Sequence, residues 1–197
     1  MKLAAVPGVT PVPMGSVDGT AAALTELVVA ARGRESAHDP GVALAARDAA
    51  EMAHANGAGL VAVVTHAEAD PAILVGMVVT ADVPLGPDAA AELAEYLGAG
   101  TADIQEVTTS RTGRGYEVVI AERLLMSGPP TAGAQLQAVV LDPDGRRMAV
   151  FTLHSTTGRG WLELATVLGQ LVSSVDFTAT GKDRRDIYAG GGRSLSR

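Results

Sequence analysis

Three arginines are the side chains in this sequence best placed to hold an anion. Arg111 precedes one copy of Thr-Gly-Arg-Gly and Arg114 lies within it, whereas Arg159 lies in a second copy, at residues 157–160. The second copy precedes a predicted helix, whose first amide groups and dipole attract anions. A flexible turn entering the next element explains the motif as well, because a phosphate-binding loop usually has more glycines at fixed spacing.

Two of the four histidines end predicted strands. His66 and His154 would meet if those strands were neighbours, and together with the arginines they would line a cleft for an anionic ligand. No two histidines have metal-ligand spacing, and a metal centre would need carboxylates such as Glu68 or Asp70 as well. We therefore predict no metal site and no cofactor. The histidines are His38, His54, His66 and His154.

Motifs for nucleophilic catalysis and nucleotide binding are missing from the sequence. It has no cysteine and no Gly-x-Ser-x-Gly, and Asp176 stands where a Walker loop ending at Gly181-Lys182 needs a glycine. We expect no enzymatic activity. Glu122 and Arg123 interrupt an apolar strand, which indicates a partly buried ion pair or a β-bulge with a structural role.

Composition favours one domain of 178 residues followed by a tail. The chain has 197 residues, of which 47% are hydrophobic and only 3% aromatic, so Ala, Val and Leu fill the core. Residues 1–181 carry 10 basic and 20 acidic side chains, which disfavours nucleic acid, and residues 182–197 carry 5 and 2. We predict that residues 179–197 form a disordered basic tail.

Membrane and export signals are also missing. No run of 18 apolar residues occurs, and Pro7 and Gly8 break the first apolar stretch too early for a signal peptide. Without cysteine there is neither a disulfide nor a lipid anchor. We expect a cytoplasmic protein that does not bind membranes.

Hydrophobic periodicity predicts an α+β fold. Apolar residues recur at helical spacing in residues 20–31 and on a stripe from Trp161 to Val175. Alanine content and helix start and stop signals favour helices at 40–56 and 87–97, and the strand segments alternate or are continuously apolar. Asp142-Pro-Asp-Gly145 is a hairpin turn, and Arg146 and Arg147 after it indicate a solvated edge. The predicted helices are 20–31, 40–56 (peripheral), 87–97 and the segment from 161; the strands are 6–14 (an edge), 59–66, 73–83, 104–109, 116–126, 134–141, 147–154 and 175–178.

Three features together resemble a protein family. They are Val6-Pro-Gly-Val-Thr-Pro-Val-Pro13 before two helices, an apolar hairpin from Leu60 to Val79, and Met148-Ala-Val-Phe-Thr-Leu-His-Ser-Thr156 before the helix at Trp161 and Val175-Asp-Phe177. The pattern is similar to uncharacterised actinobacterial proteins with the Mog1/PsbP-like fold, related in architecture to the LpqN/LpqT lipoproteins. The resemblance implies an antiparallel sheet with helices on both faces, an α/β/α sandwich, and binding or assembly functions. The lipobox cysteine of the lipoproteins is missing here.

Three functions follow as hypotheses. The first is a non-enzymatic protein that binds a partner protein, through an exposed sheet edge and with the basic tail as an accessory contact to acidic surfaces. The second is a small-molecule binder or enzyme with a cleft lined by His66, His154, Arg111, Arg114 and Arg159. In the third, the Ala-rich outer helices form a homodimer interface. The sequence does not choose between partner, ligand and self-association.

Overall fold

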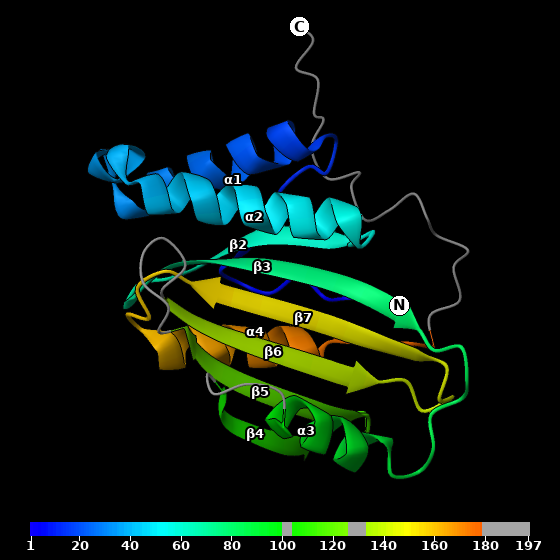
Figure 1. Cartoon of the computed structure of the whole chain (residues 1–197). Coiled ribbons are helices and arrows are strands. Elements are labelled where there is room, and N and C mark those ends of the chain that lie inside the picture. Colours follow the sequence, from blue (N-terminus) through cyan, green and yellow to red (C-terminus); the bar gives the residue numbers. More distant parts are fainter. Residues whose placement is uncertain (100–103, 126–132, 179–197) are drawn as a thin grey trace, which may run out of the picture.

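The computed structural model describes residues 1–99, 104–125 and 133–178. In this part of the chain, seven strands form one antiparallel sheet in the order β1-β2-β3-β7-β6-β5-β4 (Figure 1). The α+β class and the antiparallel sheet are therefore confirmed. The strands are β1 (Val9–Pro11), β2 (Leu60–His66), β3 (Ala69–Thr80), β4 (Ile104–Arg111), β5 (Glu117–Leu125), β6 (Gly133–Leu141) and β7 (Arg147–Ser155).

The helices begin and end close to their predicted positions. The Oγ of Ser16 accepts a hydrogen bond from the amide of Gly19 at the start of the first helix, and Asp39 caps the second through the amide of Gly41. None of the helices in the described ranges is both long and apolar enough to cross a membrane. The helices are α1 (Val17–Arg32), the 3₁₀ helix η1 (Arg34–His38), α2 (Pro40–Ala55), α3 (Ala89–Ala99) and α4 (Trp161–Ser173).

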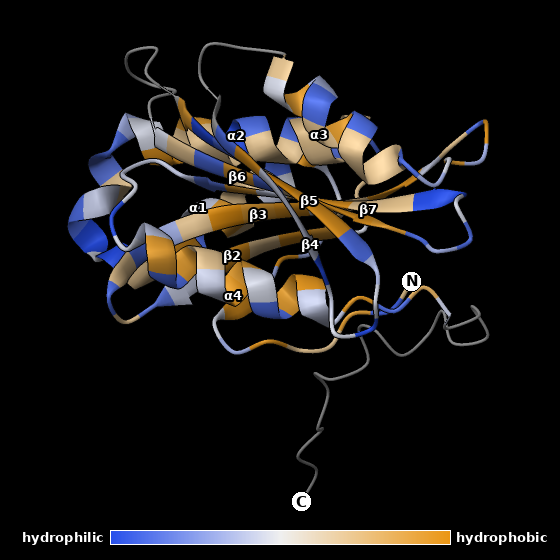
Figure 2. Cartoon of the chain, turned by 90° about the horizontal axis from the view of Figure 1, so that it is seen from below, coloured by the Kyte–Doolittle hydropathy of each residue, from blue (hydrophilic) through white to orange (hydrophobic). Residues whose placement is uncertain are grey.

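Alternate side chains of the strands contact different helices. In β2, Ala62 and Val64 join a core cluster with α4, whereas Val61 and Val63 join a cluster with α1 and α2. A third cluster holds Val119, Ala121, Val139 and Leu141 together with buried side chains of α3. The middle strands are mostly orange in the hydropathy colouring of Figure 2 because they supply all three clusters.

The prediction that the second helix is peripheral is wrong. Five alanines of α2 are buried because the small side chains let α2 approach both α1 and the sheet closely. These side chains contact the chain's own core. They are Ala45, Ala46, Ala49, Ala50 and Ala53.

Two other segments differ from the sequence prediction. The loop predicted at residues 67–72 is only a two-residue turn, because β3 already begins at Ala69. The strand predicted at 175–178 is a single bridge between Lys2 and Asp176. This segment is held mainly by side chains, since Val175 and Phe177 are buried in the cluster with α4.

Arg147 is half-buried and pairs with a buried carboxylate, which corrects the prediction of a solvated edge. Its Nε donates to Oδ2 of Asp142 at 2.6 Å, and the side chain of Asp142 is only 1% exposed. Its Nη2 donates to the carbonyl of Phe177, and its guanidinium lies 5.4 Å from the centre of that ring. Arg147 therefore ties the β6–β7 turn to the segment after α4.

Replacing Arg147 with methionine tests this ion pair, because methionine keeps an apolar stem and removes the charge. Breaking a buried pair costs about 3–5 kcal/mol, and Arg147 is itself one-third exposed, so we expect the free energy of unfolding to fall by about 2 kcal/mol. Urea denaturation at pH 7 measures it. The control is Arg146→Met, which is expected to change it by less than about 0.5 kcal/mol. Equal losses in both variants would contradict the pairing.

Candidate functional site

All three arginines that the sequence suggested for anion binding pair with carboxylates of the same chain. Arg111 donates to Glu117 at 2.8 Å, Arg114 lies 3.6 Å from Asp176, and Arg159 lies 3.5 Å from Asp70. Side chains of these arginines are more than half exposed. An external anion would have to compete with an internal carboxylate at each of them.

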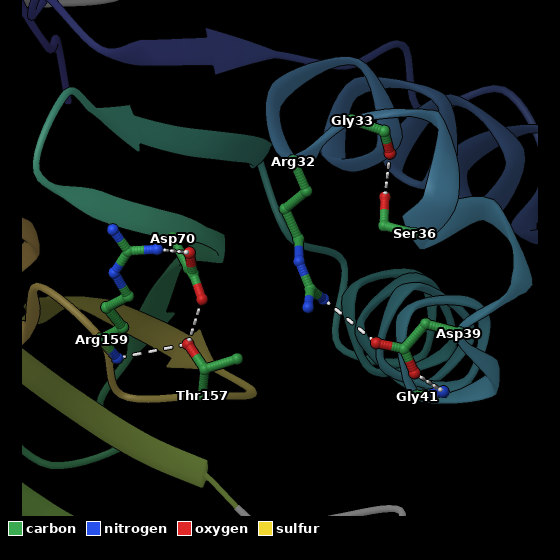
Figure 3. Close-up of polar contacts among 8 residues, drawn as sticks. All are labelled: Arg32, Gly33, Ser36, Asp39, Gly41, Asp70, Thr157 and Arg159. Carbon is green, nitrogen blue, oxygen red and sulfur yellow. Dashed lines mark hydrogen bonds and ion pairs between the residues drawn. The ribbon is translucent and has the colours of Figure 1, made fainter.

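The second Thr-Gly-Arg-Gly copy packs tightly at the start of α4. Oγ1 of Thr157 donates to Asp70 at 2.9 Å, next to the ion pair of Arg159 (Figure 3). The amide of Asp70 donates to the carbonyl of Arg159. Gly160 is in the left-handed region, with φ of 69°, and a Cβ there would overlap the backbone of Ala69. The motif joins α4 to the β2–β3 turn, and the same view shows Arg32 paired with Asp39, the cap of α2.

His66 and His154 do not meet. β3 lies between their strands, and it pairs His154 with Ile73 on one edge and His66 with Ala69 on the other, four residues away. His66 is exposed and its Nδ1 accepts a hydrogen bond from the amide of Glu68. The structure therefore does not assemble the cleft of histidines and arginines that the sequence suggested.

The other two histidines lie outside this region. Nε2 of His54 is 3.1 Å from Oγ1 of Thr20, which joins α2 to α1, and His38 is exposed at the end of η1. Within residues 1–99, 104–125 and 133–178, no three histidine or carboxylate side chains gather as metal ligands.

Polar side chains form a row across three neighbouring strands. Arg123 of β5 is opposite Gln135 of β6, and Gln135 is opposite His154 of β7. Two residues farther along the strands, Gln137 is opposite Thr152, so these two side chains lie on the same face as the first three. All five side chains are half-buried. We call these five residues the polar row.

Arg123 is the cation of the polar row, and it has no ion pair or hydrogen bond with any described residue. Its Nε is buried without a partner. Glu122 cannot pair with it, because neighbouring strand residues point to opposite faces and Glu122 accepts from Nε1 of Trp161 at 2.6 Å. The irregularity that the sequence suggested here is in the partner strand, where the register of β4 shifts between Ile104 and Glu106.

His154 contributes a second unsatisfied nitrogen. Its Nε2 is buried and has no hydrogen-bond partner in the described part of the chain. Burial lowers the pKa of His154 below its ordinary value, and the nearby charge of Asp48 on α2 opposes that shift. The imidazole is therefore neutral at pH 7. A polar residue at every second position of a central strand, as at Gln135 and Gln137, is the sequence signal that could have located the polar row.

A second feature lies at the other end of β3. The pairing with β2 stops at Gly76, whereas the pairing with β7 continues to Thr80, so β3 extends beyond its neighbour (Figure 1). A cavity of 680 Å³ lies beside this end and is lined mostly by apolar side chains. They come from the N-terminal segment, β2, β3, β7 and α4, and include Met1, Leu3, Leu60, Val78, Phe151 and Leu171.

Comparison with protein-family models and with curated protein sequences finds no match to this chain. The resemblance to the Mog1/PsbP-like family therefore stays a prediction.

Substitution of the two equivalent glycines by alanine tests the structural role of the repeated motif. The added Cβ of Gly115→Ala meets no neighbouring atom, so the only cost is that of a left-handed backbone at alanine. We expect the free energy of unfolding to fall by about 1–2 kcal/mol. Gly160→Ala adds the overlap with Ala69, and we expect a total loss of about 2–5 kcal/mol. Chemical denaturation measures both. Equal losses would show that the start of α4 is not packed on the turn.

The pH dependence of unfolding tests the environment of His154. Because its pKa is lowered in the folded state, the unfolded chain takes up the proton first as pH falls below about 6.5. The free energy of unfolding should therefore fall between pH 7.5 and 5.5, and by less in His154→Gln. Among the described residues, Asp48 from α2 is the charged group that acts on the imidazole. Identical pH profiles in urea denaturation would contradict the lowered pKa.

Proposed function

We propose that the protein binds an extended segment of a partner protein along the outer edge of β3, at residues 77–80. The observation that carries the proposal is the extension of β3 past the end of β2 beside an apolar cavity. In the described ranges no strand covers that edge. A polypeptide that adds a strand there would satisfy the backbone and place side chains in the cavity.

The backbone of β3 has the polarity that strand addition needs. The carbonyl of Gly76 accepts from the amide of Gly59, on the side of β2. Orientation alternates along an antiparallel strand, so the peptide groups of Val78 and Thr80 point to the same side. The peptide groups of Val79 and Ala81 point to the opposite side, toward β7, and the amide of Ala81 donates to the carbonyl of Arg146. Two residues therefore offer both a donor and an acceptor to an incoming strand.

The cavity defines the chemistry of the occupant. Val78 is 43% exposed at its rim, and Lys2 is the one charged residue among the described residues that line it. An incoming strand directs alternate side chains to the same face. The best match is a segment with apolar residues at alternate positions and an acidic residue that reaches Lys2.

The two outermost strands are less suited to binding a segment. β1 has only three residues, and the last of them is Pro11, which cannot donate to a ladder. β4 presents Glu106, Thr108 and Ser110, all exposed and polar, at its edge. Charged and polar side chains discourage pairing along an edge, whereas Val78 and Val79 favour it.

We place this activity in the cytoplasm, in a protein without catalytic function and with a Mog1/PsbP-like architecture from actinobacteria. The lack of cysteine and the acidic balance of residues 1–181 support a reducing compartment and disfavour nucleic acid. The basic residues of 182–197, which lie outside the described ranges, would give an accessory contact to an acidic partner.

Substitution at the β3 edge tests the proposal. Val78→Lys places a charge on the edge and at the cavity rim, and we expect at least a tenfold loss of affinity for a partner purified from lysate of the native organism. Biolayer interferometry measures the affinity. Hydrogen exchange on the complex should show new protection of the amides of Val78 and Thr80.

Leu162→Lys is the matched control, because Leu162 is an apolar residue of α4 with 75% exposure. It should leave the affinity unchanged. Protection at β4 instead of β3, or equal affinities for wild type and Val78→Lys, would contradict the proposal. If the purified protein dimerises and the same amides become protected, the strand that binds to the β3 edge comes from a second copy of the chain instead of a partner protein.

A further inference from the structure

We propose that the polar row binds a small carboxylate, with Arg123 as the residue that holds its charge. This inference does not depend on the protein-binding edge. The polar row crosses β5, β6 and β7 at Ile73 of β3, whereas the free edge begins at Met77 and its cavity is bordered by side chains of the cluster with α4.

Arg123 differs from the four arginines of the sheet and its turns that form ion pairs. Arg111, Arg114, Arg147 and Arg159 each have an internal carboxylate. Arg123 is half-buried inside a strand with no such partner among the described residues, and its Nε is out of contact with solvent. A partly desolvated cation is costly unless an anion or acceptor compensates it, so a bound anion accounts for a charge at this position.

The neighbours of Arg123 can complete the site. Gln135 is opposite Arg123 on the next strand, and Gln137 and Thr152 lie two residues farther along on the same face, so this face also carries amide and hydroxyl donors. His154 closes the row with a neutral imidazole whose Nε2 has no described partner. Neutral donors add direction and specificity without a second positive charge.

The charge balance favours a carboxylate over a phosphate. A planar guanidinium pairs with a carboxylate through two parallel hydrogen bonds, and a single negative charge matches the single cation. Phosphate carries more charge at pH 7, and the carboxylate of Asp48, which acts on His154 from α2, would repel it. The ligand class is therefore a small monoanionic carboxylate.

Arginine side-chain NMR tests the site directly. The Nε–H signal of Arg123 is followed in the full-length protein as sodium acetate is added, with sodium chloride at equal ionic strength as the reference. We expect a saturable shift of this signal with acetate and none with chloride. Arg123→Gln should weaken acetate binding at least tenfold, as followed by the ring signals of His154. Arg123→Lys keeps the charge but loses the planar guanidinium with its two parallel donors, and should weaken acetate binding severalfold.

Arg111→Gln is the matched control, because Arg111 is an arginine of the same sheet that already pairs with Glu117. It should bind acetate as wild type does. The inference is overturned if the Arg123 signal does not saturate, if Arg111→Gln weakens binding as much as Arg123→Gln, or if inorganic phosphate binds more tightly than acetate. The shift of Arg123 in the wild-type protein is decisive even if Arg123→Gln does not fold.

Discussion

The pairing of β3 with β7 is the constraint on which the rest of the structure depends. It runs from Ile73 opposite His154 to Thr80 opposite Arg147, and it joins segments that are more than 60 residues apart in the chain. On one side of this junction are β1, β2 and the helix pair α1 and α2; on the other are β6, β5 and β4 with α3. Without it the sheet would fall into two separate pieces, each with an open edge.

Both candidate sites are consequences of that junction. Because β7 pairs along β3 farther than β2 does, four residues of β3 keep an open edge beside the apolar cavity. Because β7 also pairs with β6, His154 lies next to Gln135, and β6 alone separates its strand from that of Arg123. Phe151, fully buried on β7, faces Gly76 across the junction, and a Cβ on that glycine would lie 3.1 Å from the ring. The glycine thus gives the ring its place in the core.

Among the described arginines, several pair with carboxylates that close the fold, whereas Arg123 is half-buried without such a partner. The pairs of Arg147 with Asp142 and of Arg159 with Asp70 connect turns to neighbouring elements, and both were attributed to solvent or to a ligand by the sequence alone. Arg123 was considered structural because Glu122 adjoins it, yet strand geometry sends the two side chains to opposite faces. Which arginine is available to a ligand depends on distant carboxylates, and the sequence does not place them.

The sequence by itself determined the elements, since their signals are local. Helical spacing of Leu24 and Val28, the Asp39-Pro40 cap and the turn at Asp142–Gly145 depend on residues within one or two turns of the chain, so α1, α2 and the β6–β7 hairpin were predicted correctly. Strand order, the depth at which α2 is buried and the partner of each arginine were decided only by the tertiary structure. They depend on contacts between segments far apart in the chain, whose pairing energies are not encoded in any single window of residues.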